Sequence, residues 1–184
     1  MDQNLTLTGY GVTLRRLTHD KIEMLRQWRN DPKIQQFMVY REYITPKMQE
    51  KWFEKINNDN NLYFIIEYEE KEVGMINIKD IDETTHIGEG GVFIVDEALQ
   101  NKDVAYRSHL LLFDFAFDEL DLIGVSSKII LSNTRAVRFA EYLGSKQIEE
   151  TVDDVAYFFL SKEDYLSNKN RLHFQKRWNF YNHK

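Results

Sequence analysis

Short runs of apolar residues alternate with polar segments along most of this chain, and their spacing predicts strands and helices in turn. In the first half, period-two or continuous apolar runs predict strands at residues 10–17, 62–68 and 72–78. Apolar positions at helical spacing predict helices over residues 21–30 and 46–56. Thr45 and Pro46 suit the N-cap and first position of the second helix. Glu69-Glu70-Lys71 predicts a hairpin turn between the last two strands.

The second half continues with a strand, a loop and a strongly apolar helix. The pattern predicts strands at 86–95, 126–131, 146–151 and 155–160, helices at 108–117 and after Asn133, and a polar, partly helical tail. Three consecutive strands in the middle of the chain argue against the regular alternation of a doubly wound or ferredoxin-like fold. We therefore predict an α/β protein of the α+β kind.

Composition indicates one packed domain. A chain of 184 residues with 42% hydrophobic residues is long enough and apolar enough for one core, so we expect a single domain over 1–184, with a core at about 10–165 and a tail at 166–184. The absence of cysteine excludes disulfides, a thiol nucleophile and cysteine-based metal sites, and we expect no metal ion. A net charge of −6 argues against a nucleic-acid partner. Without a long apolar run or a signal-like start, we expect a cytoplasmic protein with no membrane partner.

The junction between residues 95 and 108 carries the first sign of chemistry. A strand that opens through a short loop into a helix leaves unpaired backbone N–H groups at the helix start, and such groups bind phosphate. Ala105 is small enough for a ligand to approach the backbone, whereas the carboxylate of Asp103 would repel phosphate. Lys102, Arg107 and Ser108 are candidate compensating contacts. The alternative is a loop in which Asp103 caps the helix and no ligand binds.

This segment resembles the acetyl-CoA-binding core of the GNAT acetyltransferases. Gln100 to Ala105 is similar to the family's Q/R-x-x-G-x-G/A loop, with Asp103 where the family has glycine, and Asn133, Ala136, Phe139 and Gly144 match its N-x-x-A element. The resemblance implies a GNAT fold: a central mixed, mostly antiparallel twisted sheet of about six to seven strands with helices on both faces. It also implies acetyl-CoA as cofactor.

The same resemblance assigns the cofactor contacts. Around the pyrophosphate it implies Gln100, Asn101, Lys102, Asp103, Val104, Ala105 and Tyr106. The pantetheine arm would bind along the backbone of Val92, Phe93, Ile94 and Val95, with the first and third side chains on one face and the other two on the opposite face. Asn133 would cap its helix and bond the pantetheine.

Glu89 is the candidate catalytic base. The stretch HIGEGGVFI resembles the strand that carries a glutamate in the branch with ribosomal-protein and spermidine acetyltransferases. A carboxylate in a partly buried cleft can have a raised pKa and accept the amine proton; the alternative is an exposed strand carboxylate or ion-pair partner. Many relatives place a tyrosine acid where this chain has Ala140, and Tyr142 is the nearest substitute, although it lies about 200° around the helix.

The acceptor side follows from the N-terminal helices. Trp28 to Pro32 and the later Met38, Ile44 and Phe53 resemble two GNAT branches, the ribosomal-protein type and the amino-sugar N-acetyltransferases of pseudaminic-acid synthesis. A nucleotide-sugar pocket needs aromatic side chains for stacking and cations for the diphosphate. The candidate substrate contacts are Arg29, Met38, Tyr40, Arg41, Trp52 and Tyr157. Core packing is the alternative for the tryptophans.

We therefore predict an N-acetyltransferase that moves acetyl directly from acetyl-CoA to a primary amine. We favour a nucleotide-linked amino sugar as acceptor. The alternatives are a protein N-terminus, a polyamine, or a GNAT-fold binding module without catalysis. The tail from Asn168 to Lys184 mixes basic and aromatic residues, and we expect it to pack on the sheet or on a second copy in a homodimer.

Overall fold

The computed structural model describes residues 4–100, 102–148 and 153–171, the last three without their side chains. Its strands are β1 (Thr6–Gly9), β2 (Val12–Arg16), β3 (Leu62–Tyr68), β4 (Lys71–Asp82), β5 (Ile87–Ile94), β6 (Gly124–Ile130), β7 (Lys146–Gln147) and β8 (Val155–Ser161). Its α-helices are α1 (Ile22–Asn30), α2 (Pro32–Gln35), α3 (Pro46–Ile56), α4 (Glu97–Gln100), α5 (Val104–Asp118), α6 (Thr134–Leu143) and α7 (Lys162–Arg171). A 3-10 turn (His19–Lys21) precedes α1.

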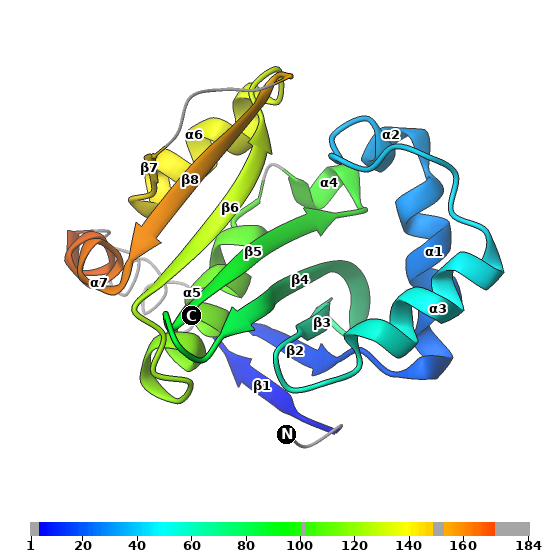
Figure 1. The fold of residues 1–184 in the computed structure, drawn as a ribbon, viewed down its shortest axis with the longest axis horizontal. Helices are drawn as coiled ribbons and strands as arrows, with labels where there is room; N and C mark the ends of the chain where they lie inside the picture. The colour runs from blue at the N-terminus through cyan, green and yellow to red at the C-terminus, as the bar shows by residue number, and fades with distance from the viewer. Residues whose placement is uncertain (1–3, 101, 149–152, 172–184) are drawn as a thin grey trace.

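The described strands form one eight-stranded sheet in the order β1-β2-β3-β4-β5-β6-β8-β7. All neighbours are antiparallel except β5 and β6, which run parallel at the centre. Figure 1 shows α1, α2 and α3 gathered at one end of the sheet, beside β2 to β5. The expected class, a mixed and mostly antiparallel sheet with helices, is confirmed.

The central pair of strands separates soon after it starts. Only three rungs join β5 to β6, from Ile87–Gly124 to Glu89–Ser126, although both strands continue well beyond them. Figure 1 shows the two strands diverging from this point. The sheet is therefore split into two arms, β1–β5 and β6–β8–β7, with Glu89 in the last rung that holds them together.

Each face of the sheet buries its own apolar cluster, and together they fix the layers. Leu14, Phe64 and Ile76 face α5 with Leu112 and Phe117, in a cluster that also reaches α7. The opposite face packs under α1 and α3, where the buried residues are Leu25, Phe53, Ile65, Met75 and Phe93. A third, smaller cluster joins α6 to β6 and β8. Helices thus cover both faces, as the alternation of side chains along each strand requires.

Several predicted elements change in extent. The strand predicted at 10–17 starts later, as β2 at Val12, because Tyr10 and Gly11 both adopt positive φ (52° and 72°) and turn the chain from β1 into β2. The additional strand β1 brings the sheet to eight strands instead of six or seven. The central helix begins at Val104, four residues earlier than predicted.

The tail is described only in its first part. Residues 162–171 form α7, and Tyr165 is buried in the main core. The predictions for residues 172–184, including the dimer contact, lie outside the described residues, as do residues 149–151 of the strand predicted at 146–151. Within the described ranges, no helix combines the length and apolar character that crossing a membrane requires.

Candidate active site

The N-terminus of α5 follows directly on the loop that the sequence predicted to bind phosphate. The first helical hydrogen bond is Arg107 N–H to the Asp103 carbonyl, at 2.9 Å. The N–H groups of Val104 and Ala105 therefore have no acceptor within the helix, and no side chain caps it. Aligned peptide dipoles add partial positive charge at this end. The site is built to receive an anion, although Asn101 of the same loop lies outside the described residues.

The side chain of Asp103 pairs with Arg107 and does not cap the helix. Its side chain makes no cap bond; its two carboxylate oxygens accept from Arg107 Nε at 2.9 Å and Nη2 at 3.2 Å. Arg107 also donates to the Tyr10 carbonyl at 3.3 Å. The capping interpretation of Asp103 is therefore wrong. This ion pair offsets the negative charge of Asp103, which would otherwise repel a pyrophosphate. It also holds the guanidinium of Arg107 at Asp103.

The open edge of β5 lies beside this loop. Val95 N–H donates to the Val73 carbonyl on β4, so by strand alternation Val92 and Ile94 point their N–H and C=O groups away from β4, into the split. Gln100 donates to the Ile94 carbonyl at 3.2 Å and accepts from Arg135 of α6 at 3.0 Å. Val92 and Ile94 also share the α5 face, as predicted. An extended ligand arm can add to this edge as a further strand.

Asn133 caps α6 as predicted: its side chain accepts from Ala136 N–H at 3.2 Å. Gly144 ends the helix at φ 101°, a left-handed conformation that favours glycine. Ala140 is buried on this helix. Tyr142 is exposed, and its ring lies edge-on to that of Tyr106, with centroids 5.5 Å apart.

Glu89 is held by two lysines. Lys79 Nζ of β4 lies 2.9 Å from Oε1, and Lys128 Nζ of β6 lies 2.7 Å from Oε2, so the half-buried carboxylate bridges the two arms of the sheet at the split. Burial raises the pKa of Glu89, but the hydrogen bonds and charges of Lys128 and Lys79 outweigh it, and the net pKa lies below the ordinary value. The expectation of a raised pKa is wrong. Tyr142 contacts α5, not this cluster.

Tyr63, Lys79 and Lys128 are site residues that the sequence analysis missed. The Tyr63 hydroxyl interacts electrostatically with Lys79, Asp80, Arg29 and Glu89, and burial first of all raises its pKa to about 12. Only the register of β3, β4 and β6 against β5 brings these side chains to one face, and no motif marks them. In β4, the spacing of two between Asn77 and Lys79 is a sequence feature that could have placed them on one face.

The predicted substrate contacts lie around the same face. Trp52 meets the Tyr63 ring edge-on at 5.0 Å, and Tyr157 of β8 lies 5.8 Å from Lys128 Nζ. Met38 packs on the cluster under α1 and α3. Trp28 packs edge-on against Phe93, which supports the core-packing interpretation for that tryptophan.

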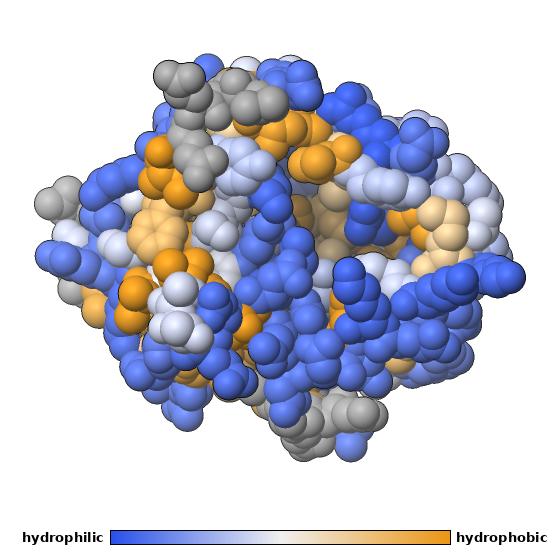
Figure 2. All heavy atoms as spheres, in the orientation of Figure 1, coloured by the Kyte–Doolittle hydropathy of each residue, from blue (hydrophilic) through white to orange (hydrophobic). Residues whose placement is uncertain are grey.

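A pocket of about 430 Å³ opens farther along this face, between the α2–α3 loop and the ends of β6 and β8. Ile130 and Val155 are paired across β6 and β8, two positions from the Lys128–Tyr157 pair, so they share its face of the sheet. Figure 2 shows this face hollowed between its two halves, with apolar side chains in the hollow and polar ones around it. The lining residues are Val39, Tyr40, Arg41, Glu42, Ile130, Asp153, Asp154 and Val155.

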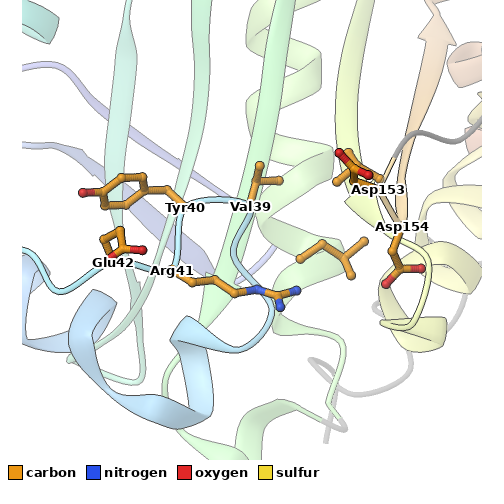
Figure 3. Close-up of a pocket in the computed structure, with 8 residues that line it drawn as sticks. Val39, Tyr40, Arg41, Glu42, Asp153 and Asp154 are labelled. Atoms are coloured by element: carbon orange, nitrogen blue, oxygen red, sulfur yellow. The ribbon is translucent and has the colours of Figure 1, made fainter.

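Charged groups dominate the rim of this pocket. Figure 3 shows Arg41 reaching from its loop toward Asp154. Asp154 itself accepts from the Ser132 hydroxyl at 2.6 Å. Three carboxylates and one guanidinium make the rim acidic, with Glu42 and Asp153 completing it. A cationic group is the chemistry that such a rim attracts.

The fold and this geometry agree with the comparisons. The acetyltransferase (GNAT) domain family matches residues 12–146, and the chain belongs to this family. The spermidine N-acetyltransferase of Vibrio cholerae, solved with CoA and spermine, superposes with a TM-score of 0.74 at 19% identity, covering 86% of this chain and 99% of that one. A domain from Methanocaldococcus jannaschii gives 0.72 at 21%, covering 82% and 97%. None of the curated protein sequences compared with the chain matches it.

The chain is therefore an N-acetyltransferase, and acetyl-CoA is its acetyl donor. The residues present fit that donor on two observations. At the start of α5, the N–H groups of Val104 and Ala105 have no acceptor within the helix, and the β5 edge at Val92 and Ile94 faces away from β4 where β6 has diverged. The first suits the pyrophosphate and the second the pantetheine arm. Acetyl-CoA supplies an acetyl group activated as a thioester.

Proposed function

We propose that this enzyme acetylates the primary amine of a small molecule, at the point where β5 and β6 part. The position of Glu89 carries the proposal. It occupies the last β5–β6 rung, so the cofactor edge starts immediately beyond it, and its carboxylate lies on the face that leads to the acceptor pocket. A reacting amine in this position would lie near both.

In the transfer, an N–C bond forms at the acetyl carbonyl carbon, the C–S bond breaks, and one proton leaves the amine while the sulfur takes one up. We propose Glu89 as the group that receives the amine proton, directly or through a water. Its two lysine bonds keep it ionised at neutral pH and fix its position. Each carboxylate oxygen retains a lone pair for the amine or the water.

The acceptor that we propose is an amino sugar linked to a nucleotide. Aromatic side chains suited to sugar and base stacking, Trp52, Tyr63 and Tyr157, line the approach to Glu89, and Arg29 provides a cation for a diphosphate. A polyamine is the second candidate, because the acidic rim attracts cations and the Vibrio cholerae neighbour is a spermidine acetyltransferase.

Release of the CoA thiol tests the proposal. Acetyl-CoA would be incubated with a UDP-linked 4-amino sugar, with spermidine and with a ribosomal-protein N-terminal peptide. We expect Glu89→Gln to lower kcat roughly 100-fold with the preferred acceptor and to leave KM for acetyl-CoA unchanged. Wild-type rates in the Glu89→Gln enzyme would remove Glu89 from the mechanism. If none of these amines causes release of the CoA thiol, the proposal itself is contradicted.

A further inference from the structure

We infer that the acceptor of this enzyme carries an anionic group, a phosphate or a carboxylate, and that Arg29 binds it. The inference rests on the proposed function, because it concerns the acceptor of the same transfer. Arg29 lies on α1 and has no counter-charge among the described residues.

Arg29 has no hydrogen-bond or ion-pair partner among the described residues, although its side chain is partly buried. Its Nε is shielded from solvent and has no hydrogen-bond partner, and in the part of the chain that the structure describes no carboxylate or carbonyl bonds its guanidinium. Burial lowers its pKa from the ordinary arginine value, yet an arginine stays charged at neutral pH. A guanidinium N–H that is shielded from water and has no acceptor carries a desolvation cost, and a bound anion can supply that acceptor.

Arg26, one turn earlier on the same helix, shows what a structural arginine looks like in this protein. It donates to both carboxylate oxygens of Glu23, at 2.7 Å each, and to the Tyr43 hydroxyl and the Ile44 carbonyl. The chain has acids in excess, with a net charge of −6. Carboxylates are therefore not scarce in this chain, and Arg29 has no partner because none of them is placed within its reach.

The other charges at the site are already matched. Lys79 and Lys128 pair with Glu89, and Lys79 also pairs with Asp80 at 3.1 Å. The site thus holds three cations, Lys79, Lys128 and Arg29, and two carboxylates. Both carboxylates, those of Glu89 and Asp80, are paired with lysines. The uncompensated positive charge is that of Arg29, which attracts an anion and repels a second ammonium.

Arg29 also lies at a useful place along the cleft. Its guanidinium interacts electrostatically with Tyr63, which neighbours Glu89, and with Tyr40, which lines the pocket. An anion bound there would sit between the reacting amine and the pocket. The rim carboxylates Glu42, Asp153 and Asp154 would repel an anion from the outer end and so favour the inner position.

Matched acceptor pairs test the inference. The pairs are a UDP-linked 4-amino sugar against the free sugar, and β-alanine against β-alaninamide, so the two arms separate phosphate from carboxylate; spermidine is the polycationic comparison. In at least one pair, we expect kcat/KM to be at least 10-fold higher for the anionic acceptor than for its matched partner. Arg29→Met should remove this preference, and Arg29→Lys should retain part of it. Arg29→Met should keep or raise Tm, because no partner is lost. Arg26→Met is the matched control: Tm falls and the ratio stays.

A binding measurement separates failure of the inference from failure of the proposed function. UDP would be titrated calorimetrically into protein saturated with CoA, so that the pyrophosphate loop is filled. UDP binding that Arg29→Met weakens 10-fold or more supports the inference even if no amine is acetylated. Transfer that is equal within each pair, or unchanged by Arg29→Met, overturns the inference and leaves the transferase function standing. No Arg29-dependent effect in either assay also overturns it.

Discussion

Individual side chains of this protein owe their chemistry to partners that lie far away in sequence. The pKa of Glu89 lies below its ordinary value because lysines of β4 and β6 reach it, while Arg29 has no ion-pair partner on α1. His109 of α5 is the opposite case. It is buried between Phe113 and Phe139, its Nδ1 lies 2.7 Å from the Ala105 carbonyl, and burial lowers its pKa to about 4.

His109 predicts a specific acid sensitivity. The folded pKa of about 4 lies below the ordinary value of 6.5, so the unfolded chain binds the proton more readily and stability falls as pH drops below 6.5, levelling off below 4. Between pH 7.5 and 5 this one group should cost about 2 kcal/mol of unfolding free energy. Urea denaturation at both pH values, with His109→Leu as comparison, checks this. An equal loss in His109→Leu would show that other groups cause it.

Among the secondary-structure elements, α5 and β5 contribute most to the site. Close approach explains the glycines that open β5: a Cβ at Gly88 would lie 2.4 Å from Ile78 Cγ2, and one at Gly90 would lie 2.9 Å from Val125 Cγ1. Small residues therefore let the neighbouring strands approach where the sheet is still joined. At the start of α5, Asp103 replaces the glycine of the family and ties down Arg107.

Asp103 should weaken cofactor binding. Asp103→Asn removes a negative charge from the anion-binding end of α5 and releases Arg107 from its ion pair. We expect acetyl-CoA to bind about 5-fold tighter, equivalent to about 1 kcal/mol, as measured by isothermal titration calorimetry. Asp118→Asn at the other end of the same helix should leave the affinity unchanged. Weaker binding in Asp103→Asn would mean that the ion pair positions Arg107 for the cofactor.

Across the whole molecule, Asp114 joins three distant segments. It accepts from the Tyr10 hydroxyl of the β1–β2 turn at 2.5 Å and from the Tyr165 hydroxyl of α7 at 2.6 Å. Tyr165 also donates to the Leu110 carbonyl at 3.2 Å, and burial first of all raises its pKa. The first hairpin, the central helix and the last described helix therefore meet at one carboxylate.

Tyr165→Phe tests how much this junction stabilises the fold. The variant keeps the buried ring but removes one hydrogen bond to a carboxylate, so we expect a loss of about 1–2 kcal/mol of unfolding free energy. The urea midpoint should fall with an unchanged slope. Tyr142→Phe, on an exposed ring, should stay within about 0.5 kcal/mol of wild type. Equal midpoints for the two variants would show that the junction adds little.

The local pattern of the chain was sufficient for the parts of the protein that local physics governs. Hydrophobic periodicity predicted most of the strands and helices, and Thr45 and Asn133 marked helix starts that the structure has. It failed at the Tyr10–Gly11 turn, because a left-handed tyrosine has no sequence signal.

Tertiary structure alone decided the charges of the site. The carboxylate of Glu89, the ion pair of Asp103 and the unmatched charge of Arg29 depend on strand register and helix packing, which place residues from four or more elements on one face. Ionisation is governed by groups within a few ångströms and by burial, neither of which a linear sequence contains. The sequence by itself therefore determined the fold family and the helix starts, and the folded molecule determined which charged side chains are paired with one another.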